Sequence, residues 1–397
     1  MNVKNKVLWM TLCIGCLAFG IAHAADATKK MSLDDCKAVL EKLKTDGKIT
    51  KYELADYGGG PVLNLSDSGM EDLSLLKGMP IAELNLSGCR KVTDLSPLKE
   101  LPAVRKLVLF GMQLKDFSVV KDLKTLRELN LGNTQISDLT PLKGLPLEGL
   151  DLGRTQISDL TPLKGMPLRK LNICCCQGVT NLSPLAGMPL ESLTLSDHGV
   201  GVGTGDISPL KGMKLKTLVT DGMPIEDLGP LAGMPIEQLW ASGIKASDIN
   251  VLRDMPLKDV SIGSSPVSDI SVLKGKQIWR LTISDTKVSD LTPLEGMPLR
   301  ELTMGSTKVK DLSVLKGMPL QHLRLGTWHG GGPGEVEDLG PLLECKELKT
   351  LTLPDSVKDI SLLKKLPKLG SINEVGINED FWKKCEAGEK PWEKKAH

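Results

Sequence analysis

The stretch Leu129–Pro167 reads LNLGNTQISDLTPLKGLP and then LEGLDLGRTQISDLTPLKGMP. The second copy follows the first by 21 residues, so Leu150 corresponds to Leu129 and Asp159 to Asp138. Variants of this unit run over most of the 397-residue chain. A stacked array of such units shares one continuous core and grows in one direction. The repetition therefore predicts a solenoid, in place of the two or three globular domains that the length alone would indicate.

Each repeat contains a short strand of the form L-x-L, in which alternate side chains point to opposite sides. The first and third residues are expected to point inward, and their neighbours to an open face. Only 3% of the chain is aromatic, so the core is expected to be aliphatic. The inward pairs are Leu63/Leu65, Leu84/Leu86, Leu107/Leu109, Leu129/Leu131, Leu150/Leu152, Leu171/Ile173, Leu193/Leu195, Leu218/Thr220, Leu239/Ala241, Val260/Ile262, Leu281/Ile283, Leu302/Met304, Leu323/Leu325 and Leu351/Leu353, with Ile372 beginning a degenerate last copy.

The strand is followed by a tight turn, an inward Ile or Val, and a segment of the form D-L-x-P-L-x-G-M-P. The proline, as in Pro141 and Pro162, excludes a long helix on the return side of the repeat. A short 3₁₀ turn is expected in its place.

The N-terminus has the features of a secretory signal. Lys4 and Lys6 precede an apolar run from Val7 to Ala22, and Ala22-His23-Ala24 fits a cleavage site between small residues. A membrane anchor is the alternative, but the run is short for a membrane span. A lipoprotein signal ending at Cys16 is a third interpretation, although the apolar run continues past that residue. The pattern favours cleavage after residue 24 and export to the periplasm, the cell surface or the medium, with no membrane span afterwards.

Both ends of the array are expected to carry helical caps, because an open solenoid end exposes its core. In residues 25–60, Ser32 is a candidate N-cap with Asp35 in the first turn, an apolar stripe follows, and Gly47 ends the helix. In residues 376–397, Asn378 opens a short helix whose Trp382 is expected to pack on the last repeat. The predicted organisation is a signal peptide (1–24), an N-terminal cap (25–60), the repeat array (61–375) and a C-terminal cap and tail (376–397).

The net charge bears on the expected partners, and the cysteine content bears on disulfide bonding. The formal net charge is +1, and removal of residues 1–24 takes away two lysines and no acid, which leaves −1. No basic face is implied, so nucleic acid is not an expected partner. Seven cysteines remain after cleavage, and an odd number without regular spacing does not indicate a disulfide framework.

The pattern resembles the leucine-rich repeat family, L-x-x-L-x-L-x-x-N/C-x-L, over about residues 62–375. The repeat segment T-Q-I-S-D-L-T-P-L-K-G is similar in sequence to the internalin type of bacterial repeat. The resemblance implies an α/β solenoid, a horseshoe with a parallel inner sheet, short 3₁₀ return segments and helical caps. The chain departs from the family at the buried Asn position, which is mostly Thr, or Cys at Cys89 and Cys176. It also has no immunoglobulin-like segment after the repeats and no wall-sorting motif, so adhesion and invasion do not carry over.

Two repeats are longer than the rest. The interval from Leu193 to Leu218 is 25 residues and contains a glycine-rich insertion at Asp197–Gly205. The interval from Leu323 to Leu351 is 28 residues and contains a second insertion at Trp328–Gly334. Both follow the strand, so both are expected at the same edge of the sheet, about 29 Å apart along the inner face.

No catalytic constellation is recognisable. His198, His322 and His329 have no triad or metal-ligand pattern around them, and no cofactor or metal site is predicted. The glycines between 199 and 203 follow a strand as a phosphate-binding loop would. They open no long helix and have no acidic partner at the required spacing, so a flexible surface loop is favoured.

The triplet Cys174-Cys175-Cys176 is the most unusual local feature of the sequence. By register, Cys176 occupies the buried Asn position, Cys174 points to the open face, and Cys175 lies in the turn. A soft-metal or redox site would need ligands from neighbouring repeats. The facing positions offer Gly153 and Ser196, which are poor ligands, so a structural role is favoured.

The open face is mostly small and polar, and such surfaces are poor in the side chains that dominate binding energy. Phe110 is an exception in the first half, and Trp240 and Arg324 are exceptions in the second. Beside Trp240 the inward positions hold the small residues Ala241 and Thr220, which leave the core incompletely filled. The indole is therefore expected either to bind a ligand or to turn aside and fill that space. The predicted ligand-binding residues are Gln238, Trp240, Asp259, Arg280, Glu301, His322, Arg324 and Trp328.

The sequence therefore predicts an exported, non-catalytic scaffold that binds a protein or an envelope polymer. The alternative is a structural envelope component that associates with copies of itself. The sequence does not identify the ligand.

Overall fold

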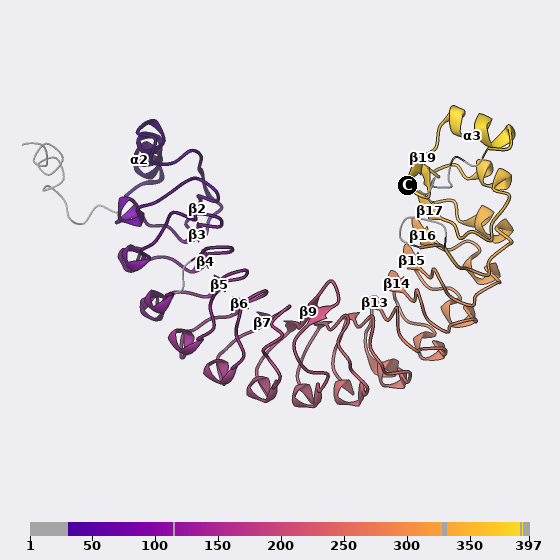
Figure 1. Cartoon of the computed structure of the whole chain (residues 1–397), viewed down its shortest axis with the longest axis horizontal. Coiled ribbons are helices and arrows are strands. Elements are labelled where there is room, and N and C mark those ends of the chain that lie inside the picture. The colour runs from indigo at the N-terminus through magenta and orange to yellow at the C-terminus, as the bar shows by residue number, and fades with distance from the viewer. Residues whose placement is uncertain (1–30, 114–115, 328–331, 390, 392–397) are drawn as a thin grey trace, which may run out of the picture.

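The computed structural model describes residues 31–113, 116–327, 332–389 and 391. They form a curved solenoid whose strands line the inner side and whose short 3₁₀ segments line the outer side (Figure 1). The predicted α/β solenoid of the leucine-rich repeat type is confirmed. The expected signal peptide, together with Trp328 and His329, lies outside the described residues.

The inner sheet has 17 strands and is parallel except at its two ends. The predicted register is confirmed, since Leu129 pairs with Leu150 and Leu150 with Leu171. The strands are β1 (Glu53–Asp56), β2 (Pro61–Asn64), β3 (Glu83–Asn85), β4 (Lys106–Val108), β5 (Glu128–Asn130), β6 (Gly149–Asp151), β7 (Lys170–Asn172), β8 (Ser192–Thr194), β11 (Thr217–Val219), β12 (Gln238–Trp240), β13 (Asp259–Ser261), β14 (Arg280–Thr282), β15 (Glu301–Thr303), β16 (His322–Arg324), β17 (Thr350–Thr352), β18 (Ser371–Ile372) and β19 (Val375–Gly376).

The outer side consists of one 3₁₀ segment per repeat, as the prolines predict. Pro141 and Pro162 each lie in the first turn of such a segment, where the missing N–H removes no hydrogen bond. The segments are η1 (Leu73–Leu76), η2 (Ser96–Glu100), η3 (Ser118–Asp122), η4 (Thr140–Leu142), η5 (Thr161–Leu163), η6 (Ser183–Leu185), η7 (Ser208–Leu210), η8 (Gly229–Leu231), η9 (Asn250–Asp254), η10 (Ser271–Leu273), η11 (Thr292–Leu294), η12 (Ser313–Leu315), η13 (Gly340–Glu344) and η14 (Ser361–Lys365).

The core is a continuous aliphatic column between the sheet and the 3₁₀ segments. Among the described residues, Phe117 and Phe381 are the only buried aromatic side chains, and the remainder is mainly Leu, Ile, Val and Met. The buried Asn position of the repeat consensus is filled by a hydroxyl or thiol group in most repeats and by an apolar residue in others, as at Met112 and Met223. Thr134 Oγ1 donates to the carbonyl oxygen of Leu131 at 2.6 Å, and Cys176 Sγ donates to that of Leu152 at 3.2 Å. Each of these hydroxyl and thiol groups satisfies a carbonyl at the turn that follows a strand.

A side-chain oxygen holds the entry to each 3₁₀ segment, and it belongs to an aspartate everywhere except at Asn181. Asp138 Oδ1 accepts the backbone N–H of Thr140 at 2.8 Å, and Asp159 Oδ1 accepts that of Thr161 at 2.8 Å. Asn181 makes the same bond to Ser183, also at 2.8 Å. The hydrogen bonds hold the pKa of the carboxyl below its usual range at Asp72, Asp94, Asp116, Asp138, Asp159, Asp206, Asp269, Asp311 and Asp359.

The array is closed at both ends. At the first end, α2 (Leu33–Thr45) begins at Ser32, whose side chain forms a capping box with Asp35. Strand β1 then pairs antiparallel with β2, an element that the sequence reading did not foresee. At the other end, β18 and β19 form an antiparallel pair, and α3 (Glu379–Glu386) begins at Asn378. No helix within the described ranges has the length and apolar character needed to cross a membrane.

We expect Asp159→Ala to lower the urea midpoint more than Pro162→Ala does. The first change leaves the Thr161 N–H without its acceptor. The second acts mostly through the unfolded chain and should cost less than about 1 kcal/mol. Asp159→Asn is the matched control and should behave like wild type, because Asn181 makes the same bond. The reverse order of the two midpoints in paired urea melts would contradict the role assigned to the carboxylate.

These aspartates also predict a pH dependence of stability. Because their folded pKa values are lowered, they contribute stability above the unfolded pKa of about 3.9, and this contribution is lost as the pH falls through the folded values. The melting temperature should be level from about pH 5 to pH 7 and decline below about pH 4. The double variant Asp138→Asn/Asp159→Asn should decline less steeply. An equal slope for variant and wild type would argue against this linkage.

Candidate functional site

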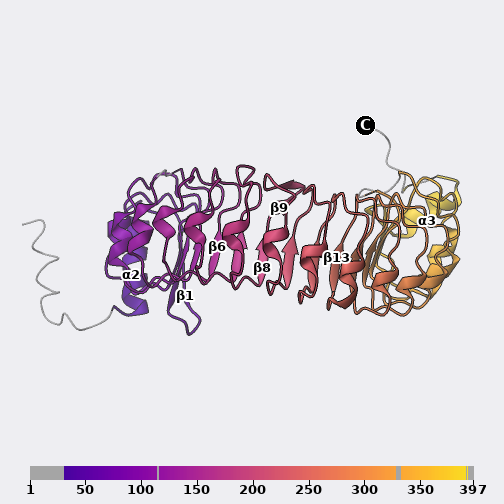
Figure 2. The same ribbon diagram turned by 90° about the horizontal axis from the view of Figure 1, so that it is seen from below.

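The inner face of the sheet is the candidate binding surface. No described helix crosses it, and the strands line the open side of the horseshoe one after another (Figure 1). Figure 2 shows how the strands lie side by side along the length of the array. This face has two chemically different halves.

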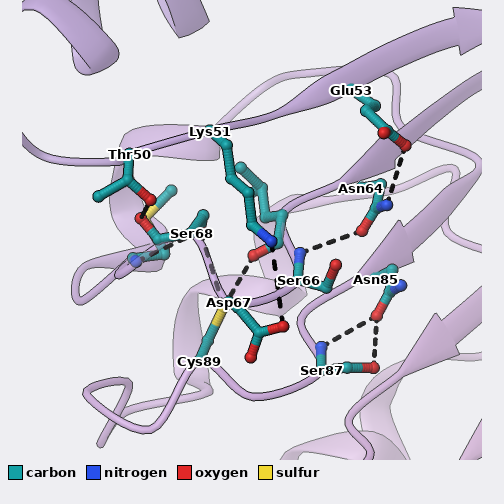
Figure 3. A network of polar contacts seen from close by, with 12 residues as sticks. Thr50, Lys51, Glu53, Asn64, Ser66, Asp67, Ser68, Asn85, Ser87 and Cys89 are labelled. Atoms are coloured by element: carbon teal, nitrogen blue, oxygen red, sulfur yellow. Dashed lines mark hydrogen bonds and ion pairs between the residues drawn. The ribbon is translucent and has the colours of Figure 1, made fainter.

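In the first half, the outward Asn and Asp side chains are used by the fold itself. Asn130 Oδ1 accepts the backbone N–H of Gly132 at 2.8 Å, and Asp151 Oδ1 accepts that of Gly153 at 3.0 Å. Figure 3 shows the same turn at the start of the array, where Asn64 and Asn85 accept the N–H groups two residues later. These residues therefore stabilise the turn after the strand. The sequence predicted only a small, polar surface at these positions and did not predict these hydrogen bonds.

A shallow hollow of about 270 Å³ lies over this half, between β4 and β8. Its outward side chains are mostly small and polar, with Lys106, Glu128, Asp151 and Lys170 as the charged members. Lys106 lies 3.3 Å from Glu128 and 3.8 Å from Glu83, so these charges are largely paired with one another. Phe110, two residues after the end of β4, is 42% exposed and is not among the residues that line the hollow.

In the second half, four of the predicted residues form one cluster around Arg280. Its guanidinium donates to Glu301 at 3.0 Å and to Asp259 at 3.3 Å. The same group lies 5.9 Å from the ring centre of Trp240 and 4.9 Å from that of Trp279. The two carboxylates and two indoles fix the orientation of the guanidinium. Trp240 is partly exposed on the open face and also packs against Arg280.

Asp259 differs from its predicted position at the surface. It lies in the outward row, but its side chain is only 2% exposed, because Arg280 and Trp240 pack over it. Its Oδ1 atom and the indole Nε1 of Trp240 are both buried, and neither has a hydrogen-bond partner of normal geometry within the described part of the chain. Burial raises the pKa of Asp259, against the opposing effects of the Arg280 charge and the Trp240 indole.

The remaining predicted residues flank this cluster. Gln238 is exposed and accepts a hydrogen bond from Thr217 at 2.9 Å, and His322 Nδ1 lies 2.8 Å from Thr350 Oγ1. Arg324 is half-buried beside Thr303 on the adjacent strand. The cluster and its flanks form one surface across β12–β16.

The first insertion differs from the expected flexible loop. It is an antiparallel hairpin of β9 (Ser196–Asp197) and β10 (Val200–Gly201), placed beyond the end of β8 at one edge of the sheet (Figure 2). Its backbone packs closely on the next repeat, since a Cβ atom at Gly222 would lie 2.4 Å from the carbonyl oxygen of Gly199. Of the second insertion, residues 332–334 are described, and the Gly332 N–H donates to Asp355 at 3.0 Å.

The hairpin brings an acidic residue to the cysteine triplet. The sulfurs of Cys174 and Cys175 and a carboxylate oxygen of Asp197 all lie within 4.8 Å of one another. Sequence reasoning assigned the facing position to Ser196 and so missed Asp197, the next residue. One feature of the sequence does point to this contact, because the cysteine triplet and the insertion occur in consecutive repeats. The described cysteines are all free thiols, and Cys176 fills the buried Asn position as predicted.

No protein-family model and no curated protein matches the sequence. Among solved structures, the chain is similar to an internalin, InlF, from Listeria monocytogenes, with 25% identity over 85% of this chain and 92% of that one and a TM-score of 0.64. It also shares the fold of a leucine-rich repeat protein from Leptospira interrogans, with 18% identity over 79% of this chain and 96% of that one and a TM-score of 0.56. The repeat pattern, the register and these similarities make the chain a leucine-rich repeat protein of the internalin-like type.

Asp259→Asn should stabilise the protein at neutral pH. Because the folded pKa of Asp259 is raised, its contribution to stability is present below the unfolded pKa of about 3.9 and is lost as the pH rises through the folded value. We expect an increase in melting temperature on the order of 1 °C at pH 7 and none below about pH 3. Glu301→Gln, on the other side of the same guanidinium, is the control for simple loss of an ion pair and should give no gain. A lower melting temperature of Asp259→Asn at pH 7 would show that the ion pair outweighs burial.

Proposed function

We propose that the chain is an exported, non-catalytic scaffold that binds a protein partner through the second half of its inner face. The observation that carries this proposal is the Arg280 cluster, which presents a partly exposed Trp240 on an otherwise small and polar sheet face. Trp and Arg are the residues that most often dominate binding energy at protein interfaces.

The cluster is also pre-organised for binding. Arg280 is held by Asp259 and Glu301, so its orientation would not have to be fixed when a partner docks. From Trp240 to Arg324 the outward positions extend about 19 Å across four strand intervals. This length suits a modest protein interface.

Export is supported by the N-terminal pattern of two lysines, an apolar run and Ala22-His23-Ala24. We propose a periplasmic, cell-surface or secreted location on this basis. An envelope polymer is a second possible ligand, and self-association within the envelope is the alternative function. Both are outcomes that the following experiment separates.

The test is a pull-down from the envelope fraction of the producing organism, followed by affinity measurements with the captured protein. Trp240→Ala and Arg324→Glu should each weaken binding by at least about tenfold. Thr303→Ala, an outward residue between them, is the matched control and should bind like wild type. Each variant is first checked for an unchanged melting temperature.

Three results would contradict this assignment. If Phe110→Ala abolishes binding while Trp240→Ala and Arg324→Glu retain it, the partner docks on the first half of the inner face. If a purified polysaccharide binds and no protein is captured, the ligand is an envelope polymer. If sedimentation shows concentration-dependent assembly without any captured partner, the chain is a self-associating component.

A further inference from the structure

Two irregular features of the sequence meet at one place in the fold. The hairpin β9–β10 occurs in the repeat that directly follows the cysteine triplet, and the backbone N–H of Cys175 donates to the carbonyl oxygen of Val200 at 3.3 Å. This bond holds the hairpin over Cys175 and brings Asp197 to the two thiols. Among the described residues, Cys174, Cys175 and Asp197 are the one group of three such side chains close enough to share an ion.

Two glycines in the neighbouring repeats leave space for this group of side chains. A Cβ atom at Gly153 would lie 2.8 Å from Cys174 Sγ, so only glycine leaves room for the thiol at that position. On the other side, the hairpin is fixed by close contact with Gly222. Cys174 is 6% exposed, whereas Cys175 and Asp197 are partly exposed. One thiol is therefore enclosed, and the other two groups remain open to an entering ion.

A fourth ligand becomes available if the side chain of His198 rotates, because its ring nitrogens are not among the atoms that lie within 4.8 Å of one another. His198 Nε2 lies 3.5 Å from Asp197 Oδ1, and its side chain is 87% exposed and free to turn. Two ligands of a tetrahedral Zn²⁺ ion, each about 2.1 Å from the metal, are separated by about 3.4 Å. We propose that Cys174, Cys175, Asp197 and His198 form a binding site for a thiophilic divalent cation of the Zn²⁺ class.

The identity of the donors selects this class of cation. Two sulfur ligands disfavour Ca²⁺ and Mg²⁺, which take oxygen ligands. A mixed set of sulfur, nitrogen and oxygen donors suits Zn²⁺, which is borderline soft and has no geometric preference of its own.

Arg154 completes the charge balance of the site. Its Nη2 atom donates to Asp197 Oδ2 at 2.6 Å, which leaves Oδ1 on the side of His198. Two thiolates and one carboxylate are neutralised by the divalent ion together with the guanidinium, while His198 stays neutral. Burial, followed by the neighbouring Cys175 and Asp197, raises the pKa of Cys174 to about 12. Thiols coordinate a metal ion as thiolates, so binding releases one proton from each coordinating thiol to solvent, and no electron is transferred.

Cys176 is not part of the site. Its sulfur is buried, donates to the carbonyl oxygen of Leu152 at 3.2 Å and contacts Thr155 Oγ1 at 3.4 Å. Thr134 and Thr155 occupy the same position in the two preceding repeats, so Cys176→Thr should preserve the fold. This substitution is a matched control that removes one cysteine of the triplet without removing a ligand.

The experiment titrates the reduced full-length chain with Zn²⁺ in the presence of a chromophoric chelator, and with Co²⁺ as a spectroscopic substitute. Wild type should bind one ion per chain and show the thiolate charge-transfer and tetrahedral ligand-field bands of Co²⁺. Cys175→Ser and Asp197→Asn should each weaken Zn²⁺ binding by more than about 100-fold. Arg154→Gln should weaken it by about 10- to 100-fold, as for other groups that orient a ligand. Cys176→Thr should match wild type, and Zn²⁺ should raise the melting temperature only in chains that bind it.

The proposal is overturned if wild type binds no more Zn²⁺ than the double variant Cys174→Ser/Cys175→Ser. It is also overturned if Cys176→Thr loses binding while Cys175→Ser retains it. A third contrary result would be a reduced chain that ignores Zn²⁺ and, on exposure to oxygen, forms a Cys174–Cys175 disulfide seen by mass spectrometry. Unchanged melting of the variants without metal shows that a loss of binding is not a loss of fold.

Discussion

The parallel pairing of equivalent residues in consecutive repeats is the constraint on which the rest of the molecule depends. Leu129, Leu150 and Leu171 lie opposite one another, so each repeat is stacked on the next at the strand spacing of about 4.8 Å. The 3₁₀ segments on the outer side have no such ladder, and the array curves with the sheet on its inner side (Figure 1). The tight inner spacing brings outward side chains within reach of their equivalents. Asn130, Asp151 and Asn172 consequently form a chain of hydrogen bonds along the face.

Local pattern was sufficient to predict the main elements of each repeat. The inward leucines, the 3₁₀ turns at Pro141 and Pro162, and the Ser32 cap each depend on residues close together in sequence. Their geometry is set by periodicity, proline and side-chain capping, which a single sequence displays. Register then follows, because the same unit is copied and every copy must bury the same residues.

Two unpredicted features of the candidate site, the burial of Asp259 and the contact of Asp197 with the cysteines, depend on contacts between one repeat and the next. The burial of Asp259 results from Arg280 and Trp240, which come from the strands on either side of it. The contact of Asp197 with Cys174 depends on the fold of an insertion whose glycines show no periodicity. For the predicted binding residues, the sequence placed Trp240, Arg280 and Glu301 on one surface correctly, because strand alternation decides this. It could not show that they hold one another in place.

The turn after most strands contains a residue in the left-handed region, and this has a consequence for how such a chain can change over evolutionary time. The position is glycine in some repeats, as at Gly111 (φ 71°), and Asn133, Arg154 and Cys175 in the next three, with φ values of 54°, 60° and 60°. A non-glycine residue there costs about 1–2 kcal/mol of backbone energy, yet the stacking of leucines is the same in all these repeats. The rim of the solenoid is thus a row of positions where a new chemical group can be introduced without altering the core. A copied unit can diverge there first, so chemical novelty would accumulate along this edge while the horseshoe stays constant.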